Sequence, residues 1–194
     1  MKEFFNVISH GRRNARHRRK GGETFRHRAA ADAGECRKER GVLRDNLKKW
    51  TKWHIGTLKS MYVDVLYPTN QFAFADTFKK CDVIIDALVG YGINRPPSGF
   101  YESLIKMANE SGKKILSIDM PTGMNPDTGG PYGACMKAKW TLSVGMPKKG
   151  LLEKKAKDFT GMLYLCDIGI PPEVYELLQI KYENPFDRNE IVKL

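Results

Sequence analysis

The chain has 194 residues, about the length of a single domain. Hydrophobic residues make up 41% of it, which is enough to form a packed core and excludes a wholly disordered protein. The mean hydropathy is −0.47, and no apolar run approaches the roughly 18 residues that a membrane-spanning helix requires. We therefore expect a protein without a membrane segment.

The four cysteines lie far apart in the sequence and form no CxxC pair. Zinc sites need clustered ligands, and small disulfide-stapled domains are secreted, whereas reduced thiols are typical of intracellular proteins. The first residues also lack the pattern of a secretory signal peptide. We therefore expect a cytoplasmic protein with four reduced thiols, namely Cys36, Cys81, Cys135 and Cys166.

The net charge of +11 comes almost entirely from the N-terminal end. Residues 1–50 contain 15 Lys and Arg against 6 Asp and Glu, whereas residues 51–194 contain 18 against 16. Three interpretations of the arginine-rich residues 10–28 remain open: a solvated arm, an arm that binds RNA, DNA or an acidic surface, and an organelle-targeting sequence. We divide the chain into a basic segment, residues 1–44, and a folded domain, residues 45–194. Any contact with nucleic acid would involve the basic segment alone.

The first predicted element is an amphipathic helix, roughly Cys36–Trp53, in which several apolar residues share one face. From residue 61 onwards, short apolar runs alternate with polar turns. Most of these runs are nearly continuous, which is typical of parallel strands that are buried on both faces. The runs span residues 61–67, 82–90, 114–120, 139–146 and 162–170.

A helix is expected over residues 98–112, with Ser98 as its N-cap and Gly112 as its C-terminal stop. Together with the strands on either side it forms a βαβ unit, whose crossover should be right-handed. A proline pair predicts the start of a last helix over Glu173–Gln179. The pattern predicts an α/β domain with a three-layer, Rossmann-like fold and a mainly parallel sheet.

Two of the predicted strands end on an aspartate, Asp86 and Asp119. Because ligands of open parallel sheets bind beyond the carboxyl ends of the strands, we expect both carboxylates at one edge. Asp86 is either a buried carboxylate with satisfied hydrogen bonds or a ligand of a hard cation. Asp119 either caps the amides of a loop or acts as a general acid/base. Oxygens of Thr122 would complete an all-oxygen site, which suits K⁺, Mg²⁺ or Ca²⁺ better than zinc.

Two loops that follow predicted strands carry candidate binding groups. The segment Gly90–Gly92 lacks a side chain at two positions, so its backbone can approach a ligand closely and offer amides to a phosphate, helped by Arg95. A plain tight turn explains the same residues. In the second loop, Lys148 or Lys149 either meets a phosphate or is solvated.

Four motifs in chain order resemble the NAD(P)H-hydrate epimerase family, the YjeF N-terminal domain. They are DVIIDALVGYGINRPP, KKILSIDMPTGMNPDTG, SVGMPKKGLL and MLYLCDIGIP. The family has, in the same order, a strand ending in D-A-L-x-G-x-G, a strand ending in D-x-P-S-G, a K-x-G-L loop and a late D-I-G-I-P. The resemblance covers roughly residues 45–180, and four ordered motifs are far more specific than any one of them.

The resemblance implies a Rossmann-like homodimer that interconverts the R and S forms of hydrated NADH and NADPH, which carry a hydroxyl at C6 of the nicotinamide ring. A separate dehydratase would use the S form. The resemblance also implies one potassium ion per subunit, held by Asp86 and by Thr122 in place of the family's serine. Asp119 would be catalytic, contacting the hydrated nucleotide and assisting proton transfer. The implied substrate-binding residues are Gly90, Tyr91, Gly92, Ile93, Asn94, Arg95, Pro96 and Asp119.

The chain departs from the family near its N-terminus, where the family's G-x-G-N-N-G-G-D-G loop is absent. That loop supplies another potassium ligand and part of the substrate cradle. Either a reading-frame error that ends near residues 40–50 or a true divergence explains the loss. The alternative to an enzyme is a non-catalytic scaffold or RNA-binding module of the same fold. Retention of Asp86, Asp119 and the segment Gly90–Pro96 together favours the enzyme.

Overall fold

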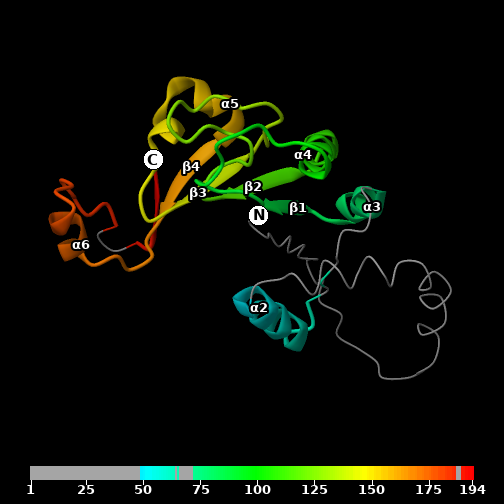
Figure 1. Cartoon of the computed structure of the whole chain (residues 1–194), viewed down its shortest axis with the longest axis horizontal. Coiled ribbons are helices and arrows are strands. Elements are labelled where there is room, and N and C mark those ends of the chain that lie inside the picture. The colour runs from blue at the N-terminus through cyan, green and yellow to red at the C-terminus, as the bar shows by residue number, and fades with distance from the viewer. Residues whose placement is uncertain (1–48, 64, 66–71, 187–188) are drawn as a thin grey trace. The chain divides into compact units, whose positions relative to one another are not determined.

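The computed structural model describes residues 49–63, 65, 72–186 and 189–194 (Figure 1). The chain forms two compact units, and among the described residues the boundary lies between Cys81 and Asp82. The boundary expected after residue 44 falls outside the described residues, as does the basic segment before it. Within the described ranges, every helix is too short or too polar to cross a membrane.

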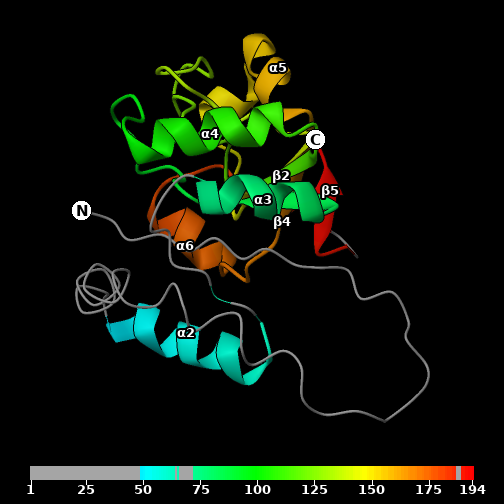
Figure 2. The same cartoon turned by 90° about the vertical axis from the view of Figure 1, so that its right-hand side faces the viewer.

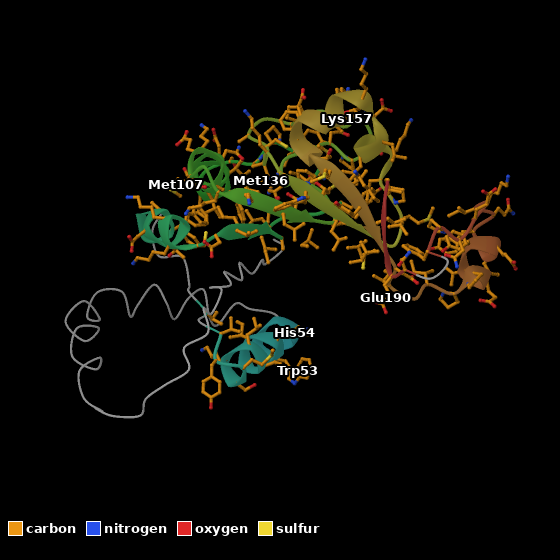
Figure 3. All side chains as sticks on the ribbon, turned by 180° about the vertical axis from the view of Figure 1, so that it is seen from behind. Trp53, His54, Met107, Met136, Lys157 and Glu190 are labelled. Atoms are coloured by element: carbon orange, nitrogen blue, oxygen red, sulfur yellow. The ribbon has the colours of Figure 1, made fainter. Side chains whose placement is uncertain are left out.

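In the first unit, α2 spans Lys49–Ser60. The predicted helix, Cys36–Trp53, begins outside the described residues, and the observed helix continues beyond its predicted end. Ile55 lies in the part of the helix beyond the predicted end and is only 5% exposed. Its burial stabilises the additional helical turns. The exposed rings of Trp53 and His54 meet edge to face at 5.0 Å (Figure 3).

The second helix of this unit, α3, spans Phe72–Lys80 and was not predicted. Phe74 and Phe78 are four residues apart, both are buried, and their ring centroids lie 6.1 Å apart. This spacing is the sequence signal of the helix. The apolar run at residues 61–67, predicted as a strand, begins instead with a turn, in which Tyr62 has φ 59°. Most of the remaining run lies outside the described residues.

The second unit is built on a five-stranded sheet in the order β1-β2-β3-β4-β5 (Figure 1). The first four strands pair in parallel, and β5 pairs antiparallel with β4. This arrangement confirms the α/β class and the mainly parallel, Rossmann-like sheet. β5 was not predicted, because a three-residue strand carries no measurable period. The strands are β1 Val83–Asp86, β2 Lys114–Ile118, β3 Trp140–Val144, β4 Met162–Cys166 and β5 Ile191–Lys193.

The strands alternate between buried and partly exposed residues, although the apolar runs predicted burial on both faces. In β2, for example, Ile115 and Ser117 are 2% and 0% exposed, whereas Leu116 and Ile118 between and after them are only half-buried. One face of the sheet is therefore covered more closely than the other. Figure 2 shows α4 and α5 on the same side of the sheet, with α6 away from both.

The predicted helix between β1 and β2 is α4, Phe100–Glu110. The prediction that Ser98 caps it is wrong, because the N-cap is Gly99, which forms no side-chain cap hydrogen bond. Gly99 has φ 59°, a conformation that glycine adopts without steric cost, so the chain enters the helix one residue later. Gly112 follows the helix with φ 68°, as a C-terminal stop should. The buried residues of the helix are Leu104, Ile105 and Ala108.

The C-terminal part of the unit contains several short helices. The predicted last helix is α6, Pro172–Leu177, which begins within the proline pair. Between β3 and β4 lie two 3₁₀ turns and a short helix that were not predicted, because elements of three or four residues are too short for a helical period. They are η1 Lys149–Leu152, η2 Lys154–Ala156 and α5 Lys157–Thr160.

Candidate functional site

Three parallel strands end at one edge of the sheet, and a polar side chain follows or ends each of them. β1 ends at Asp86, and its register pairs Asp86 with Ser117 of β2. β2 is followed directly by Asp119, and β3 by the loop that contains Lys148. The two aspartates therefore lie at the same edge, as expected for two parallel strands joined by one crossover.

Asp86 is buried and holds two loops together through hydrogen bonds. Its carboxylate accepts hydrogen bonds from the Thr122 hydroxyl at 2.7 Å, the Thr122 N–H at 2.9 Å and the Ser117 hydroxyl at 2.8 Å. The Leu88 N–H approaches the same carboxylate at 3.4 Å. With only 1% of Asp86 exposed, these groups replace the water that the carboxylate has lost. The hydrogen bonds satisfy Asp86 and also join the end of β1 to the loop after β2.

The charge of Asp86 has no positive partner among the described residues. Burial raises the pKa of Asp86, and the hydrogen bonds from Thr122, Ser117 and Leu88 oppose that rise. The four ion pairs found in the described ranges involve other carboxylates. A buried carboxylate without a counter-charge is stabilised by a proton or by a bound cation.

The Thr122 hydroxyl lies between Asp86 and the loop after β1. It accepts a hydrogen bond from the Val89 N–H at 3.1 Å, and it lies 3.3 Å from the Val89 carbonyl oxygen. The next residue, Gly123, has φ 97°, and a Cβ there would lie 2.1 Å from the Ala134 carbonyl oxygen. Only glycine fits this turn, so the turn fixes the position of Thr122 beside Asp86.

The oxygens in this cluster suit a hard cation. They belong to the Asp86 carboxylate, the Thr122 hydroxyl and the Val89 carbonyl, with no sulfur or nitrogen ligand among them. Across the described ranges, His, Cys, Asp and Glu never gather in groups of three or more. An all-oxygen donor set with one carboxylate fits K⁺, Mg²⁺ or Ca²⁺ better than zinc.

Asp119 differs from Asp86 in both exposure and partners. One carboxylate oxygen accepts the Tyr91 N–H at 3.1 Å, and the other accepts a hydrogen bond from the Lys148 ammonium. The side chain of Asp119 is 25% exposed. A Cβ at Gly90 would lie 2.5 Å from the Asp119 carboxylate, so the loop after β1 approaches Asp119 this closely only because residue 90 is glycine.

The segment Gly90–Pro96 forms a turn beside Asp119. The Ile93 N–H donates to the Gly90 carbonyl oxygen at 3.3 Å, and Ile93 itself is buried. Tyr91 is 60% exposed although its N–H is bonded to Asp119. The segment therefore offers accessible groups to a ligand next to a carboxylate. Its other exposed residues are Gly92, Asn94, Arg95 and Pro96.

The structure distinguishes two lysines that the sequence left equivalent. Lys148 is partly buried and donates to Asp119 and, at 3.2 Å, to the Val144 carbonyl oxygen. Lys149, the next residue, is exposed. The ion pair was not predicted, because 29 residues separate its partners and only the fold brings them together.

The fold and the site define a protein of the open α/β class with two aspartates at the carboxyl edge of a mainly parallel sheet. A family model described as YjeF-related protein N-terminus matches residues 41–150, more than half of the chain. The chain therefore belongs to the family of YjeF-related N-terminal domains. The first two motifs quoted above lie wholly within the match, and the late DIGIP motif lies beyond it.

Curated relatives and a solved structure agree with this assignment. An NAD(P)H-hydrate epimerase of Lentilactobacillus buchneri is 44% identical over 93 residues, 48% of this chain and 43% of the relative. A bifunctional NAD(P)H-hydrate repair enzyme of Thermofilum pendens is 30% identical over 143 residues, 74% of this chain and 26% of the relative. The chain spans less than half the length of these relatives. The crystal structure of yeast ynu0 shares the fold, with a TM-score of 0.65 at 20% identity over 77% of this chain and 62% of that one.

Proposed function

We propose that this protein is an NAD(P)H-hydrate epimerase, an isomerase that interconverts the R and S forms of hydrated NADH and NADPH. The observation that carries the proposal is the placement of Asp119. It follows β2 at the carboxyl edge of the sheet, within the segment that matches the family, and its partly exposed carboxylate is held from two sides. Relatives named NAD(P)H-hydrate epimerase support the same activity.

The substrate-binding residues that we propose are Asp119 and the turn beside it, Gly90–Pro96. The turn offers backbone groups and the Arg95 guanidinium, which suit the phosphates of a dinucleotide. Asp119 would contact the hydrated nicotinamide ring. Inversion at C6 requires that the hydroxyl leave and return, and a positioned carboxylate assists the proton transfers that this requires.

We further propose that Asp86 and Thr122 hold a potassium ion, with the Val89 carbonyl as a neighbouring ligand. The support is the buried carboxylate, which has no counter-charge within the described ranges, and the all-oxygen set around it. The ion supplies positive charge that offsets the Asp86 carboxylate and the phosphates of the nucleotide.

We also propose a homodimer and a separate dehydratase that consumes the S form. Light scattering after size-exclusion chromatography tests the dimer.

An epimerisation assay on the purified chain tests the activity. R-NADHX is supplied, an S-specific dehydratase is coupled, and recovery of NADH is followed with K⁺ or with tetramethylammonium as the main cation. We expect turnover that depends on K⁺ and that Asp119→Asn abolishes. A folded chain without turnover, beside an active control epimerase, would contradict the proposal and favour a non-catalytic module of the same fold.

The potassium site has a readout that does not depend on turnover. A ligand that binds only the folded state raises the unfolding temperature. We expect K⁺ to raise the unfolding temperature of the wild-type chain relative to tetramethylammonium, and to have less effect on Asp86→Asn. Equal effects of K⁺ on the two proteins would remove Asp86 from the ligand set.

A further inference from the structure

Lys148 reaches Asp119 from a third strand of the sheet. Its ammonium donates to the carboxylate of Asp119 and to the Val144 carbonyl oxygen at the end of β3. The Tyr91 N–H, from the loop after β1, holds the other oxygen of the same carboxylate. Asp119 is therefore the meeting point of the loops that follow β1, β2 and β3.

The Lys148–Asp119 pair is shielded from water. Its side chains are 15% and 25% exposed, whereas the other three ion pairs in the described ranges have side chains that are 41% to 90% exposed. Shielding strengthens the attraction between the partners, because little water screens it. An ammonium held in this way is poorly hydrated and stays beside the carboxylate.

The backbone at Asp119 is held in an unusual conformation. Its φ is 74°, in the left-handed region that side chains other than glycine seldom adopt. Such a conformation costs free energy and persists where surrounding contacts enforce it, often at functional sites. Here the contacts from Tyr91 and Lys148 to the carboxylate fix the side chain of Asp119.

The hydrogen bonds decide which partner carries a mobile proton. Both oxygens of Asp119 act as acceptors, one from the Tyr91 N–H and the other from the Lys148 ammonium, so the protons in these two contacts belong to the donors. The carboxylate therefore contributes no proton to either contact. The departing hydroxyl needs a proton, and in the part of the chain that the structure describes, Lys148 is the side chain that donates to Asp119.

We propose that Lys148 is the proton donor of the reaction, with Asp119 as the carboxylate that orients it and stabilises the positive ring. This inference rests on the proposed epimerase activity. C6 of the hydrate is bonded to the ring nitrogen N1. As the C6–O bond breaks, the hydroxyl takes a proton from Lys148 and leaves as water, while the lone pair of N1 forms a C6=N1 double bond. The ring is then a cation, and Lys148 is a neutral amine.

The reverse steps on the other face of the ring complete the inversion. A water oxygen forms the new C6–O bond, the electron pair of the C6=N1 double bond returns to N1, and the proton released by the water restores the ammonium of Lys148. Atoms, charge and electrons balance without an oxidant or reductant. In both steps the Asp119 carboxylate lies beside the positively charged ring. Its negative charge favours the ring cation over the neutral hydrate.

Lys148→Arg and Lys148→Met separate proton transfer from charge. Arginine keeps the positive charge but does not release its proton, and methionine removes both. We expect both variants to lose about 10²- to 10³-fold in kcat, with a smaller change in KM. Added ethylammonium should restore part of the activity of Lys148→Ala. Lys114→Met, at the opposite end of β2, removes an exposed lysine and should keep wild-type activity.

The outcomes are distinct. An active wild-type chain with a Lys148→Arg variant of nearly wild-type kcat would overturn the proton-donor role and leave Lys148 as a charge that positions Asp119. An inactive wild-type chain would remove the proposed function and this inference together. Circular dichroism and the unfolding temperature show whether each variant is folded. A loss of kcat in folded Lys148→Arg, together with rescue of Lys148→Ala by ethylammonium, supports the role of Lys148 as the proton donor.

Discussion

Asp86 ends β1 and Asp119 follows the neighbouring parallel strand β2, yet the two carboxylates differ in exposure and in the charge of their partners. Asp86 is 1% exposed and is surrounded by hydroxyl and N–H donors that carry no charge. The side chain of Asp119 is 25% exposed and pairs with the ammonium of Lys148. The buried carboxylate joins the strand end to a loop, whereas the other is partly open to solvent.

This comparison teaches that position at a strand end does not define the role of a carboxylate. The loop after β2 turns inward at Thr122, which closes over Asp86, and Asp119 lies three residues before that turn. Burial and the charge of the partner distinguish the two carboxylates, and under the proposed function only the partly exposed one meets the substrate. Substitutions at the two sites should therefore change different measurements.

The largest expected effect is the loss of activity in Asp119→Asn. An amide keeps the shape but loses the charge that pairs with Lys148, so kcat/KM should fall by about 10³-fold. Asp127→Asn makes the same chemical change at an exposed residue of the following loop and serves as the control. Coupled NADH recovery measures both. If Asp119→Asn retained wild-type turnover, the carboxylate would have no part in the reaction.

The next effect is on stability, and it should separate the two aspartates. Asp86→Ala leaves the Thr122 N–H and the Ser117 hydroxyl without their acceptor in a buried place, which should lower the free energy of unfolding by about 3 kcal/mol. Asp119→Ala leaves the Lys148 ammonium with the Val144 carbonyl oxygen as an acceptor and with partial access to water, so it should cost only about 1 kcal/mol. Urea denaturation measures both values, and equal losses would contradict the comparison.

The pH dependence of stability should distinguish Asp86 as well. Burial raises the pKa of Asp86 above 3.8, so between that value and its folded-state pKa the folded chain holds a proton that the unfolded chain has lost. Its contribution to stability is therefore full below pH 3.8 and decreases as the pH rises through the folded-state pKa. The stability of wild type relative to Asp86→Asn should fall as the pH rises, in buffer without K⁺. A constant difference would show that Asp86 does not titrate in this way.

A smaller effect on activity is expected from Gly90→Ala. The added Cβ would lie 2.5 Å from the Asp119 carboxylate, so either the loop or the carboxylate must move. We expect kcat/KM to fall about tenfold, because small displacements of catalytic groups are costly. Gly130→Ala is the matched control, since the nearest neighbour of its Cβ would be the Thr128 hydroxyl at 3.8 Å. Equal activity of the two variants would show that Asp119 does not depend on this close approach.

The smallest expected effect concerns the thiol near Asp86. Burial, and after it the charge of Asp86, raise the pKa of Cys135 to about 12, so the thiol stays protonated and unreactive. In the folded chain, iodoacetamide at about pH 8 should modify Cys166, which is partly exposed, much faster than Cys135. Mass spectrometry of the digested protein measures the two rates. Equal rates would place Cys135 in a different environment.

Much of the fold follows from local sequence. Four apolar runs became β1 to β4, and the helix between β1 and β2 formed where Leu104, Ile105 and Ala108 share one face. Such elements are predictable because their periods are properties of neighbouring residues. β5 escaped prediction because its three residues form a strand only by pairing with β4. The start of α4 differed because the backbone of Gly99, and not the side chain of Ser98, begins the helix.

For the site, the sequence by itself determined the two aspartates, Thr122 and the glycine-containing turn, since each lies next to a predicted strand end or within an ordered motif. The tertiary structure decided their surroundings. It buried Asp86 under Thr122, left Asp119 partly exposed and brought Lys148 to it from 29 residues away. A carboxylate's exposure and charged partner depend on how separate loops meet at the edge of the sheet, and no local pattern in the chain encodes that meeting.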